Sequence, residues 1–403
     1  MQIVKDYKTI PQLFYSITKE YGKDNDRPVF KHKVNNQWTD ISYNQFYSEA
    51  ENLGLGMVSM GIKRGDKIAI ISENRPEWAY TDMAILGIGA IDVPLYPIST
   101  ADSIEFILNN SEAVAVVVSN RFHLNKVLKI RDKCKNLKFI VVLNSNDKGN
   151  EKDVFSLVEI QAKGLDFKKD HHTYFLESLR LSQEDDTCTI IYTSGTTGQP
   201  KGVMLTHKNI ISNVKGALEV FSINEADTFL SFLPLCHIFE RMTGYYTAFA
   251  GGCTIAYAES IEKITSNMED IKPTIITAVP RLFERMYSKI LKNVESQPEK
   301  KQKIFRWAIE LGKEYQIAKR SGQPIPVFLS LKHKLADKLV FAKLRDVTGG
   351  KIRFFVSGGA ALARELGIFF DAVGILILEG YGMTESSPVI SVNRPNDYKF
   401  GTI

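Results

Sequence analysis

Short apolar runs alternate along the chain with longer stretches of helical periodicity. The runs are rich in β-branched residues, which favours strands. The stretches between them repeat apolar residues three and four positions apart, which favours amphipathic helices. We expect strands at 67–72, 113–119, 139–144, 187–193, 228–233, 253–258, 274–279, 352–356 and 375–378. We expect helices between most of these, for example at 44–60, 77–86, 103–109 and 332–347.

This alternation predicts an α/β fold with two αβ lobes, whose mostly parallel sheets are flanked by helices. The 403 residues are enough for two such lobes. We place the lobes at about residues 1–186 and 187–392, with 393–403 as an exit segment. The stretch 144–165 is rich in Asn, Asp and Lys, so we expect it to be an exposed excursion between the lobes.

One loop carries the strongest chemical signal. Residues 192–202 read Tyr-Thr-Ser-Gly-Thr-Thr-Gly-Gln-Pro-Lys-Gly, and seven of these eleven are Gly, Ser or Thr. The loop follows the expected strand 187–193 and precedes a helix expected to open at Thr206. Glycines let backbone N–H groups approach an anion, hydroxyls add donors, and Lys201 adds positive charge. Strand, loop and helix together predict a polyphosphate site; the alternative is a flexible surface loop.

Two common nucleotide motifs are excluded. A Walker loop needs Lys directly after its last glycine, but Gly198 is followed by Gln199 and Pro200. The Gly-Ile-Gly segment at 87–89 lacks the third glycine of a dinucleotide fingerprint.

Three further segments follow the loop. They are Leu-Pro-Leu-Cys-His-Ile-Phe-Glu-Arg at 233–241, Val-Pro-Arg-Leu-Phe-Glu at 279–284 and Gly-Tyr-Gly-Met-Thr-Glu at 380–385. In this order, the four segments resemble the motifs of the adenylate-forming (AMP-dependent synthetase/ligase) superfamily. The His-Ile-Phe-Glu-Arg ending of 233–241 and the segment 279–284 are most similar to long-chain fatty acid–CoA ligases. The likeness runs from about Pro11 to the last residue.

The resemblance implies a two-step reaction with ATP and Mg²⁺. A fatty acid and ATP give an acyl-adenylate and pyrophosphate, and CoA then displaces AMP. Two alternatives stay open. One is a fatty acyl–AMP ligase that loads a carrier protein, and the other is a non-catalytic module that binds ATP or acyl-adenylate.

The resemblance also assigns the phosphates and the metal. It implies that the nucleotide phosphates are held by Thr193, Ser194, Gly195, Thr196, Thr197, Gly198 and Lys201. Thr384 is expected to contact the α-phosphate, and Glu385 is the expected Mg²⁺ ligand, since carboxylate oxygen suits a hard cation. The alternative for Glu385 is an acidic residue in the first turn of a helix.

The base and the acyl group are assigned in the same way. Tyr381 is expected to stack on adenine, with Gly359 and Ala360 lining its other face; the alternative for Tyr381 is a core aromatic. His237 is expected near the acyl carboxylate, and its alternative is a structural role. Candidates for the apolar acyl pocket come from the region of Phe232, Phe239, Met242, Val279 and Tyr381.

The family's sequences continue well past residue 403. The resemblance therefore implies that the β-barrel lobe is incomplete and that the C-terminal lid domain, with its lysine, is absent. We expect the 403-residue chain to bind ATP weakly and to be impaired in both half-reactions.

Charge and cysteine usage bear on partners and setting. Residues 281–322 hold eleven Lys or Arg and five Asp or Glu. This segment is expected either to contact anionic lipid peripherally or to be a solvated pair of helices. Nucleic-acid binding is not expected, because no nucleic-acid motif accompanies the charge. Scattered cysteines and the lack of a leader or of ~18 consecutive apolar residues predict a cytoplasmic protein; the oligomeric state is left open.

Overall fold

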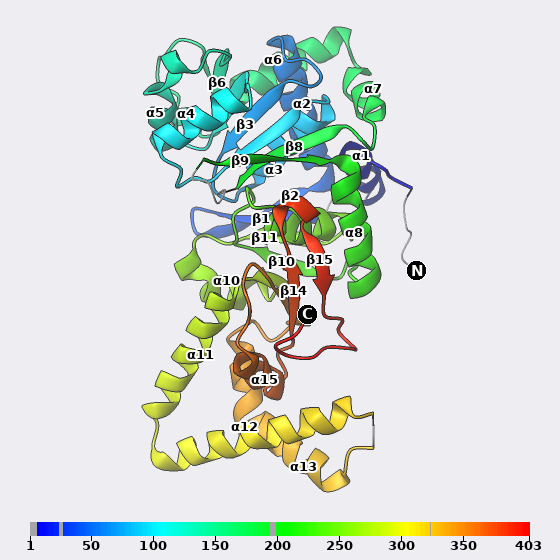
Figure 1. Cartoon of the computed structure of the whole chain (residues 1–403), viewed down its shortest axis with the longest axis vertical. Coiled ribbons are helices and arrows are strands. Elements are labelled where there is room, and N and C mark those ends of the chain that lie inside the picture. Colours follow the sequence, from blue (N-terminus) through cyan, green and yellow to red (C-terminus); the bar gives the residue numbers. More distant parts are fainter. Residues whose placement is uncertain (1–5, 24–26, 194–198, 323) are drawn as a thin grey trace. The chain divides into compact units, whose positions relative to one another are not determined.

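The computed structural model describes residues 6–23, 27–193, 199–322 and 324–403 (Figure 1). By their contacts, the residues form two compact units. Unit 1 comprises Met1–Glu219, Leu233–Tyr257 and Thr384–Pro388, and unit 2 comprises Val220–Phe232, Ala258–Met383 and Val389–Ile403. Each unit is thus assembled from segments that are far apart in the sequence.

A seven-stranded sheet forms the centre of unit 1. Its strand order is β7-β6-β5-β3-β4-β8-β9, and every pair is parallel except β8–β9. The strands are β3 (Lys67–Ile71), β4 (Ile91–Leu95), β5 (Ala115–Val118), β6 (Phe139–Val142), β7 (Val154–Ser156), β8 (Thr187–Thr193) and β9 (Lys201–Thr206). The central apolar runs are buried on both faces because helices cover both sides of the sheet.

The helices of this sheet follow the predicted alternation. They are α1 (Ile10–Tyr21), α2 (Tyr43–Ser59), α3 (Pro76–Gly87), α4 (Ala101–Asn110), α5 (Arg121–Leu128), α6 (Leu157–Asp170), α7 (Tyr174–Leu181) and α8 (His207–Phe221), with short turns η1 (Arg131–Lys133) and η2 (Ser145–Asp147). Helices α4 and α5 share an apolar core with one face of the sheet. Helices α2, α3, α6 and α7 pack against one another on the other face (Figure 1).

Residues 144–165 are not an exposed excursion, so that expectation was wrong. They contribute edge strand β7 and the first half of helix α6. The helix begins with a capping box, in which the Ser156 hydroxyl accepts from the Glu159 amide and the Glu159 carboxylate accepts from the Ser156 amide. Polar residues before β7 dominate the composition of this stretch and hid a short strand and an amphipathic helix.

Helix α6 approaches helix α2 very closely. A Cβ placed on Gly164 would collide with the backbone oxygen of Asn52, and one placed on Gly56 would collide with the backbone oxygen of Ile160. Both positions therefore need glycine for a steric reason and not for a special φ angle.

A smaller group of strands in unit 1 was not predicted, except for β11. Strand β1 (Pro28–Val34) pairs antiparallel with β2 (Gln37–Ser42) and parallel with β11 (Thr254–Tyr257). Asn35 and Asn36 form the tight turn between β1 and β2, both with positive φ. The π-helix η3 (Glu240–Thr247) and the short helix α9 (Ala248–Ala250) precede β11.

Unit 2 contains five strands in the order β15-β14-β13-β12-β10. Strands β10 (Thr228–Ser231), β12 (Ile275–Ala278), β13 (Phe354–Ser357) and β14 (Ile377–Gly382) are parallel, and β15 (Val389–Val392) is antiparallel to β14. The other elements are η4 (Ile261–Lys263), α10 (Ile264–Ile271), α11 (Pro280–Glu295), α12 (Glu299–Arg320), α13 (Val327–Ala336), η5 (Asp337–Phe341), α14 (Ala342–Asp346), α15 (Arg364–Ala372) and η6 (Thr384–Ser386), the last of which belongs to unit 1.

The basic segment 281–322 forms helices α11 and α12, as its periodicity suggested. Helix α12 packs against α13 and α15 through a face that includes Phe305 and Ile309. Ile304 and Trp307 share the apolar spacing but lie on the solvent side, 41% and 38% exposed. Across the described residues, helices long and apolar enough for a bilayer crossing are lacking. All four cysteines are buried.

Candidate functional site

The glycine-rich loop connects the two strands of an antiparallel hairpin, β8 and β9. Strands β8 and β9 pair so that Thr193 lies opposite Lys201 and Tyr192 lies opposite Gly202. A Cβ on Gly202 would come within 2.8 Å of the Ile190 side chain, so the strand needs glycine directly after the lysine. The remaining predicted loop residues lie outside the described residues: Ser194, Gly195, Thr196, Thr197 and Gly198.

The hairpin corrects the predicted order of strand, loop and helix, because strand β9 lies between the loop and helix α8. The predicted helix start is right: the Thr206 hydroxyl accepts a hydrogen bond from the Asn209 amide at 3.2 Å and caps α8. The segment 201–206 is too short and too exposed to show a clear alternation of apolar and polar residues. It forms a strand because it pairs with the edge of β8.

Helix α4 contacts strand β8 at the end of the hairpin where the loop begins. The Tyr192 hydroxyl donates to Oδ1 of Asn110 at 2.6 Å, and its ring meets the edge of Phe106 with centroids 6.4 Å apart. Tyr192 directly precedes Thr193, where the loop begins. A helix on the core side of the sheet therefore fixes the position of one end of the loop.

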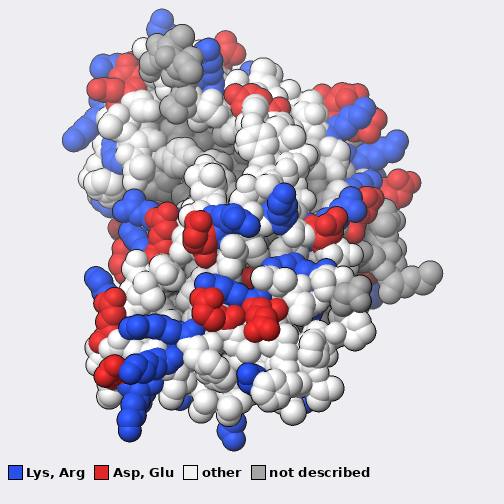
Figure 2. Space-filling model, turned by 60° about the horizontal axis from the view of Figure 1, so that its bottom comes forward, with Lys and Arg blue, Asp and Glu red and all other residues white. Residues whose placement is uncertain are grey.

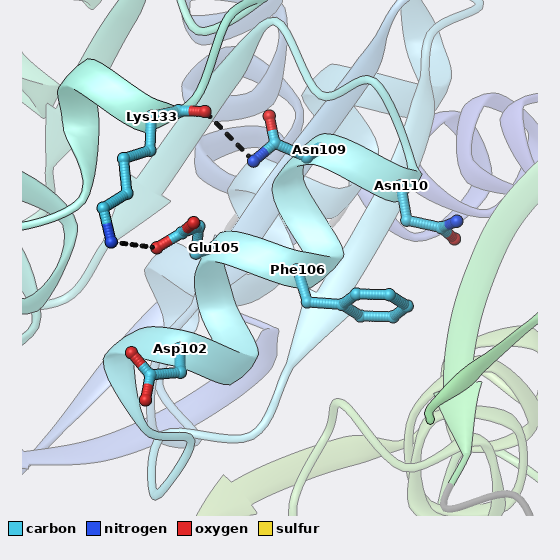
Figure 3. Close-up of a pocket in the computed structure, with 6 residues that line it drawn as sticks. All are labelled: Asp102, Glu105, Phe106, Asn109, Asn110 and Lys133. Carbon is cyan, nitrogen blue, oxygen red and sulfur yellow. Dashed lines mark hydrogen bonds and ion pairs between the residues drawn. The ribbon is translucent and has the colours of Figure 1, made fainter. Parts of the chain in front are cut away.

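A surface pocket of about 620 Å³ lies on the outer side of α4 (Figure 3). It is lined by Asp102, Glu105, Phe106, Asn109, Asn110 and Lys133. Lys133 pairs with Glu105 at 3.1 Å, and its backbone oxygen accepts from Asn109 at 3.1 Å. None of the predicted site residues lines this pocket, so it is not the predicted nucleotide site.

The start of the segment 233–241 is bound by one side-chain amide, that of Asn74. Nδ2 of Asn74 donates to the backbone oxygen of Leu233 at 2.7 Å, and Oδ1 of Asn74 accepts from the Leu235 amide at 3.0 Å. This double contact fixes the turn that presents His237. Cys236 beside it is buried, and burial raises the pKa of its thiol to about 12, so Cys236 is not a candidate nucleophile.

His237 has a defined hydrogen-bonding state. The backbone amide of Phe239 donates to Nδ1 of His237 at 3.2 Å. Burial lowers the pKa of the His237 imidazole, which favours the neutral ring. With Nδ1 as the acceptor, the ring proton resides on Nε2. His237 can therefore offer an N–H donor to an anion.

Arg241 closes the same segment and is fully buried in an ionic network. Its guanidinium pairs with Asp82, with Oδ2 of Asp92 at 2.7 Å, and with the hydroxyl of Thr189 at 2.9 Å. Nε donates to the Tyr246 hydroxyl at 2.8 Å, and that hydroxyl donates to Asp82. The network joins the segment after His237 to α3, to β4 and to the strand that leads into the glycine-rich loop.

The network contains two carboxylates for one guanidinium. Burial raises the pKa of Asp82 to about 7; Arg241 opposes this shift and Asp92 adds to it. Protonation of Asp82 lowers the negative charge that faces Arg241. The sequence analysis recognised the segment 233–241 but did not predict the buried ionic network of Arg241. The one available signal was a charged residue within an apolar stretch.

Thr384 and Glu385 lie next to the hairpin. They begin the short turn η6, which packs against β9 within unit 1. Thr384 is half-buried and Glu385 is exposed. Glu385 lies in the first turn of this three-residue 3-10 helix, so the alternative of an acidic residue in the first turn of a helix stays open. The structure thus brings three predicted residues, Lys201, Thr384 and Glu385, to neighbouring elements of one unit.

The residues predicted for adenine lie in unit 2 on neighbouring parallel strands. Strand β13 is followed by Gly358, Gly359 and Ala360, and the end of strand β14 carries Tyr381. Gly359 has a φ of +79°, which other residues adopt rarely, and Ala360 is exposed. Tyr381 is 52% exposed, which excludes the alternative of a core aromatic.

Comparisons with known proteins identify the class. In fold, the chain is similar to the N-terminal domain of FACL13 from Mycobacterium tuberculosis, with a TM-score of 0.63 at 18% identity, covering 96% of this chain and 79% of that one. The fold is that of the N-terminal domain of adenylate-forming enzymes. The chain belongs to the AMP-binding enzyme family, whose model matches residues 18–403.

Within the family, the chain is similar to ligases of long-chain fatty acids. The chain is 32% identical over 382 residues to the long-chain-fatty-acid–CoA ligase FadD15 of Mycobacterium bovis, covering 94% of this chain and 62% of the relative. It is 29% identical over 423 residues to the chloroplastic long-chain-fatty-acid–[acyl-carrier-protein] ligase AEE15 of Arabidopsis thaliana, covering 96% of this chain and 56% of the relative. The chain therefore spans about three-fifths of the length of these relatives.

Proposed function

We propose that this chain is the nucleotide-binding part of a long-chain fatty acid–CoA ligase. In this proposal, a fatty acid and ATP give acyl-adenylate and pyrophosphate, and CoA then releases AMP and forms the acyl thioester. The family, the relative FadD15 and the segments 237–241 and 279–284 support it. The protein would act in the cytoplasm, with ATP, CoA and fatty acid as its small-molecule partners.

The proposed phosphate site is the hairpin loop. Residues 193–198 would supply backbone N–H groups and hydroxyls to the β- and γ-phosphates. Lys201 stands opposite Thr193 at the other end of the loop and is exposed, so its ammonium is free to reach an anion from there. A loop that binds through many weak donors can also release pyrophosphate after the reaction.

The chemical step brings two anions together. A carboxylate oxygen of the fatty acid attacks the α-phosphorus, the bond to the bridging oxygen breaks, and pyrophosphate leaves. Thr384 would donate to the α-phosphate, and the Nε2 proton of His237 would orient the carboxylate. In the second step, the CoA sulfur attacks the acyl carbonyl carbon and AMP leaves.

The proposed cation is Mg²⁺, which would neutralise phosphate charge in the first step. Among the described residues, no cluster of three or more His, Cys, Asp or Glu side chains could hold a metal ion. Mg²⁺ commonly binds through one or two carboxylates together with substrate phosphates. The exposed carboxylate of Glu385, on the turn beside β9, fits that mode.

The proposed adenine site uses the edge of the unit 2 sheet. Tyr381 presents an exposed ring at the end of β14, and Gly359 and Ala360 follow the next strand. Small residues there leave room for a flat base, which an aromatic ring stacks on favourably.

One observation carries the proposal: the turn with Thr384 and Glu385 packs against the strand that begins with Lys201. The test uses Lys201→Ala and Glu385→Ala. Each should weaken ATP binding by about tenfold or more, because each removes a charged partner of the nucleotide or its metal. Lys208→Ala and Glu219→Ala, exposed on α8, are the matched controls. Calorimetry with the 403-residue chain, with and without Mg²⁺, gives the affinities.

Product analysis tests the reaction itself. The complete gene product is incubated with ATP, Mg²⁺ and fatty acids of increasing length, with CoA present or withheld, and the products are identified by mass. Acyl-adenylate without CoA and acyl-CoA with it are expected. If neither forms with any acid while ATP still binds, the non-catalytic module becomes the better reading.

The second candidate function is a ligase that loads an acyl carrier protein. The relative AEE15 favours it. The same assay with a carrier protein in place of CoA separates the two, because only one acceptor should be acylated efficiently.

A further inference from the structure

Helix α13 and the turn after it expose a row of large apolar side chains. These form what we call the α13 face: Val327, Phe328, Leu331, Leu335 and Leu339. Their exposures run from 43% for Leu339 to 76% for Val327. Scattered apolar residues on a surface are ordinary, but five on one short stretch of helix mark a contact surface.

The opposite side of α13 already serves the core. Leu329 and Ala336 are buried, and His333 stacks on Tyr315 of α12 with centroids 3.7 Å apart. The helix is therefore apolar on two sides, of which only one packs against the protein. Core packing accounts for the buried side and leaves the α13 face unexplained.

Lysines border the α13 face. By helical geometry, Lys334 lies on one side of the apolar row and Lys332 on the other. The ammonium of Lys332 lies 4.2 Å from the ring centre of Phe328, so positive charge and apolar surface are in direct contact. Lys338 and Lys343 continue the basic margin.

Acidic residues are nearly absent from this stretch. Between residues 327 and 343, four lysines stand against one carboxylate, Asp337. Asp337 pairs with Arg345 at 2.7 Å and is half-buried. Figure 2, which turns the α12 and α13 region forward, shows broad uncharged surface with blue basic side chains at its margins in the lowest part of the view.

We propose that the α13 face binds an anionic lipid bilayer. The apolar row would enter the boundary between headgroups and acyl chains, and the lysines would meet lipid phosphates, as for helices that lie in the membrane plane. This goes beyond the proposed reaction, since it assigns a surface to a segment that carries none of the predicted catalytic residues.

Charge favours lipid over a second copy of the chain. A two-fold contact would bring the same surface of both copies together, and their lysine margins would face each other. An anionic bilayer instead supplies a neutralising partner for every lysine. Helix α12 also exposes apolar side chains, Ile304, Trp307 and Ile317, but they are fewer than on the α13 face.

The experiment measures binding of the 403-residue chain to vesicles by co-sedimentation, without ATP or fatty acid. Vesicles of phosphatidylcholine with phosphatidylglycerol are compared with phosphatidylcholine alone. Phe328→Ser with Leu331→Ser should weaken binding by about tenfold or more. Lys332→Gln with Lys334→Gln should weaken it by about fivefold per lysine and reduce its salt dependence.

Two matched controls sharpen the test. Val158→Ser with Leu165→Ser removes equally exposed apolar residues from α6, at 62% and 53% exposure. Lys289→Gln with Lys292→Gln removes charge from the basic segment 281–322, for which lipid contact and a solvated pair of helices were the two alternatives. Neither pair should reduce vesicle binding, and circular dichroism should show every variant folded.

Three outcomes would overturn the proposal. The first is that the chain does not bind anionic vesicles. The second is that the α11 lysine pair and the α13 lysine pair lose vesicle binding equally. The third is a dimer in sedimentation velocity that Phe328→Ser with Leu331→Ser dissociates while vesicle binding persists. Because no nucleotide is present, these outcomes do not depend on the proposed reaction.

Discussion

The hydroxyl of Tyr192 donates a 2.6 Å hydrogen bond to Oδ1 of Asn110. The bond joins helix α4 to strand β8 one residue before the glycine-rich loop begins. The loop therefore starts from a position set by the core of unit 1 and not by its own flexible composition.

Replacing Tyr192 by Phe should loosen that starting position. The variant removes one hydrogen bond, so the free energy of unfolding should fall by about 1 kcal/mol. We also expect ATP affinity to fall several-fold, because the loop would be less ordered before binding. Urea unfolding and calorimetry give the two quantities. Asn109→Ala is the control, since Asn109 bonds to the backbone of Lys133 instead. If Tyr192→Phe leaves the ATP affinity unchanged, the bond to α4 does not order the loop for ATP binding.

His207 should make the fold sensitive to mild acid. Its Nδ1 accepts from the Ile10 amide at 3.4 Å, and burial lowers its pKa to about 4. Because the folded pKa lies below the unfolded value of 6.5, this contribution to stability is complete above pH 6.5 and is lost as pH falls towards 4. We expect His207→Gln, which can still accept the hydrogen bond, to lose less stability over that range.

The comparison must be made as a difference between the two proteins. Asp82 has a raised pKa, so its protonation favours the folded state over an overlapping range and acts in the opposite direction. Chemical denaturation at several pH values measures both proteins. Parallel stability curves for wild type and His207→Gln would show that His207 contributes nothing to the acid response.

Arg241→Met should be among the most damaging single substitutions in unit 1. It leaves two carboxylates buried without their partner, which typically costs about 3–5 kcal/mol. Adding Asp82→Asn and Asp92→Asn removes the stranded charges and should restore part of the loss. Thermal unfolding of the single and triple variants tests this. If the triple variant is no more stable than Arg241→Met, packing and not charge explains the effect.

Gly164→Ala and Gly216→Ala should have opposite effects although both glycines are helical. A methyl at Gly164 collides with the backbone oxygen of Asn52 and should push α6 away from α2, at a cost of about 1–3 kcal/mol for overpacking. A methyl at Gly216 meets no atom within 4 Å and should stabilise helix α8 by up to about 1 kcal/mol. Equal changes in melting temperature would contradict the close approach.

The sequence allowed prediction where the signal is local. Strand β8 was predicted with its bounds, because its apolar run ends sharply at the glycine-rich loop. The Thr206 cap was predicted from a single residue type. Strand β7 and the β1–β2 hairpin were missed because their apolar runs are short and polar neighbours dominate each window.

The long-range part of the site could not be predicted. The Thr189, Asp92 and Asp82 partners of Arg241 lie 52, 149 and 159 residues away in the sequence, so no local pattern announces them. The packing of η6 on β9 likewise depends on tertiary contacts between distant segments. The resemblance to a family supplied the residues that local patterns could not connect.

The interleaving of the two units restricts how this polypeptide can be divided. Residues 384–388 belong with the glycine-rich hairpin, although strands β14 and β15 on either side of them belong to the other unit. No single cleavage point therefore separates the units, and a gene cut after residue 219 would leave the first piece without the η6 turn and the segment of His237. Because unit 1 takes segments from both pieces, we expect it to form only when the two pieces are expressed together.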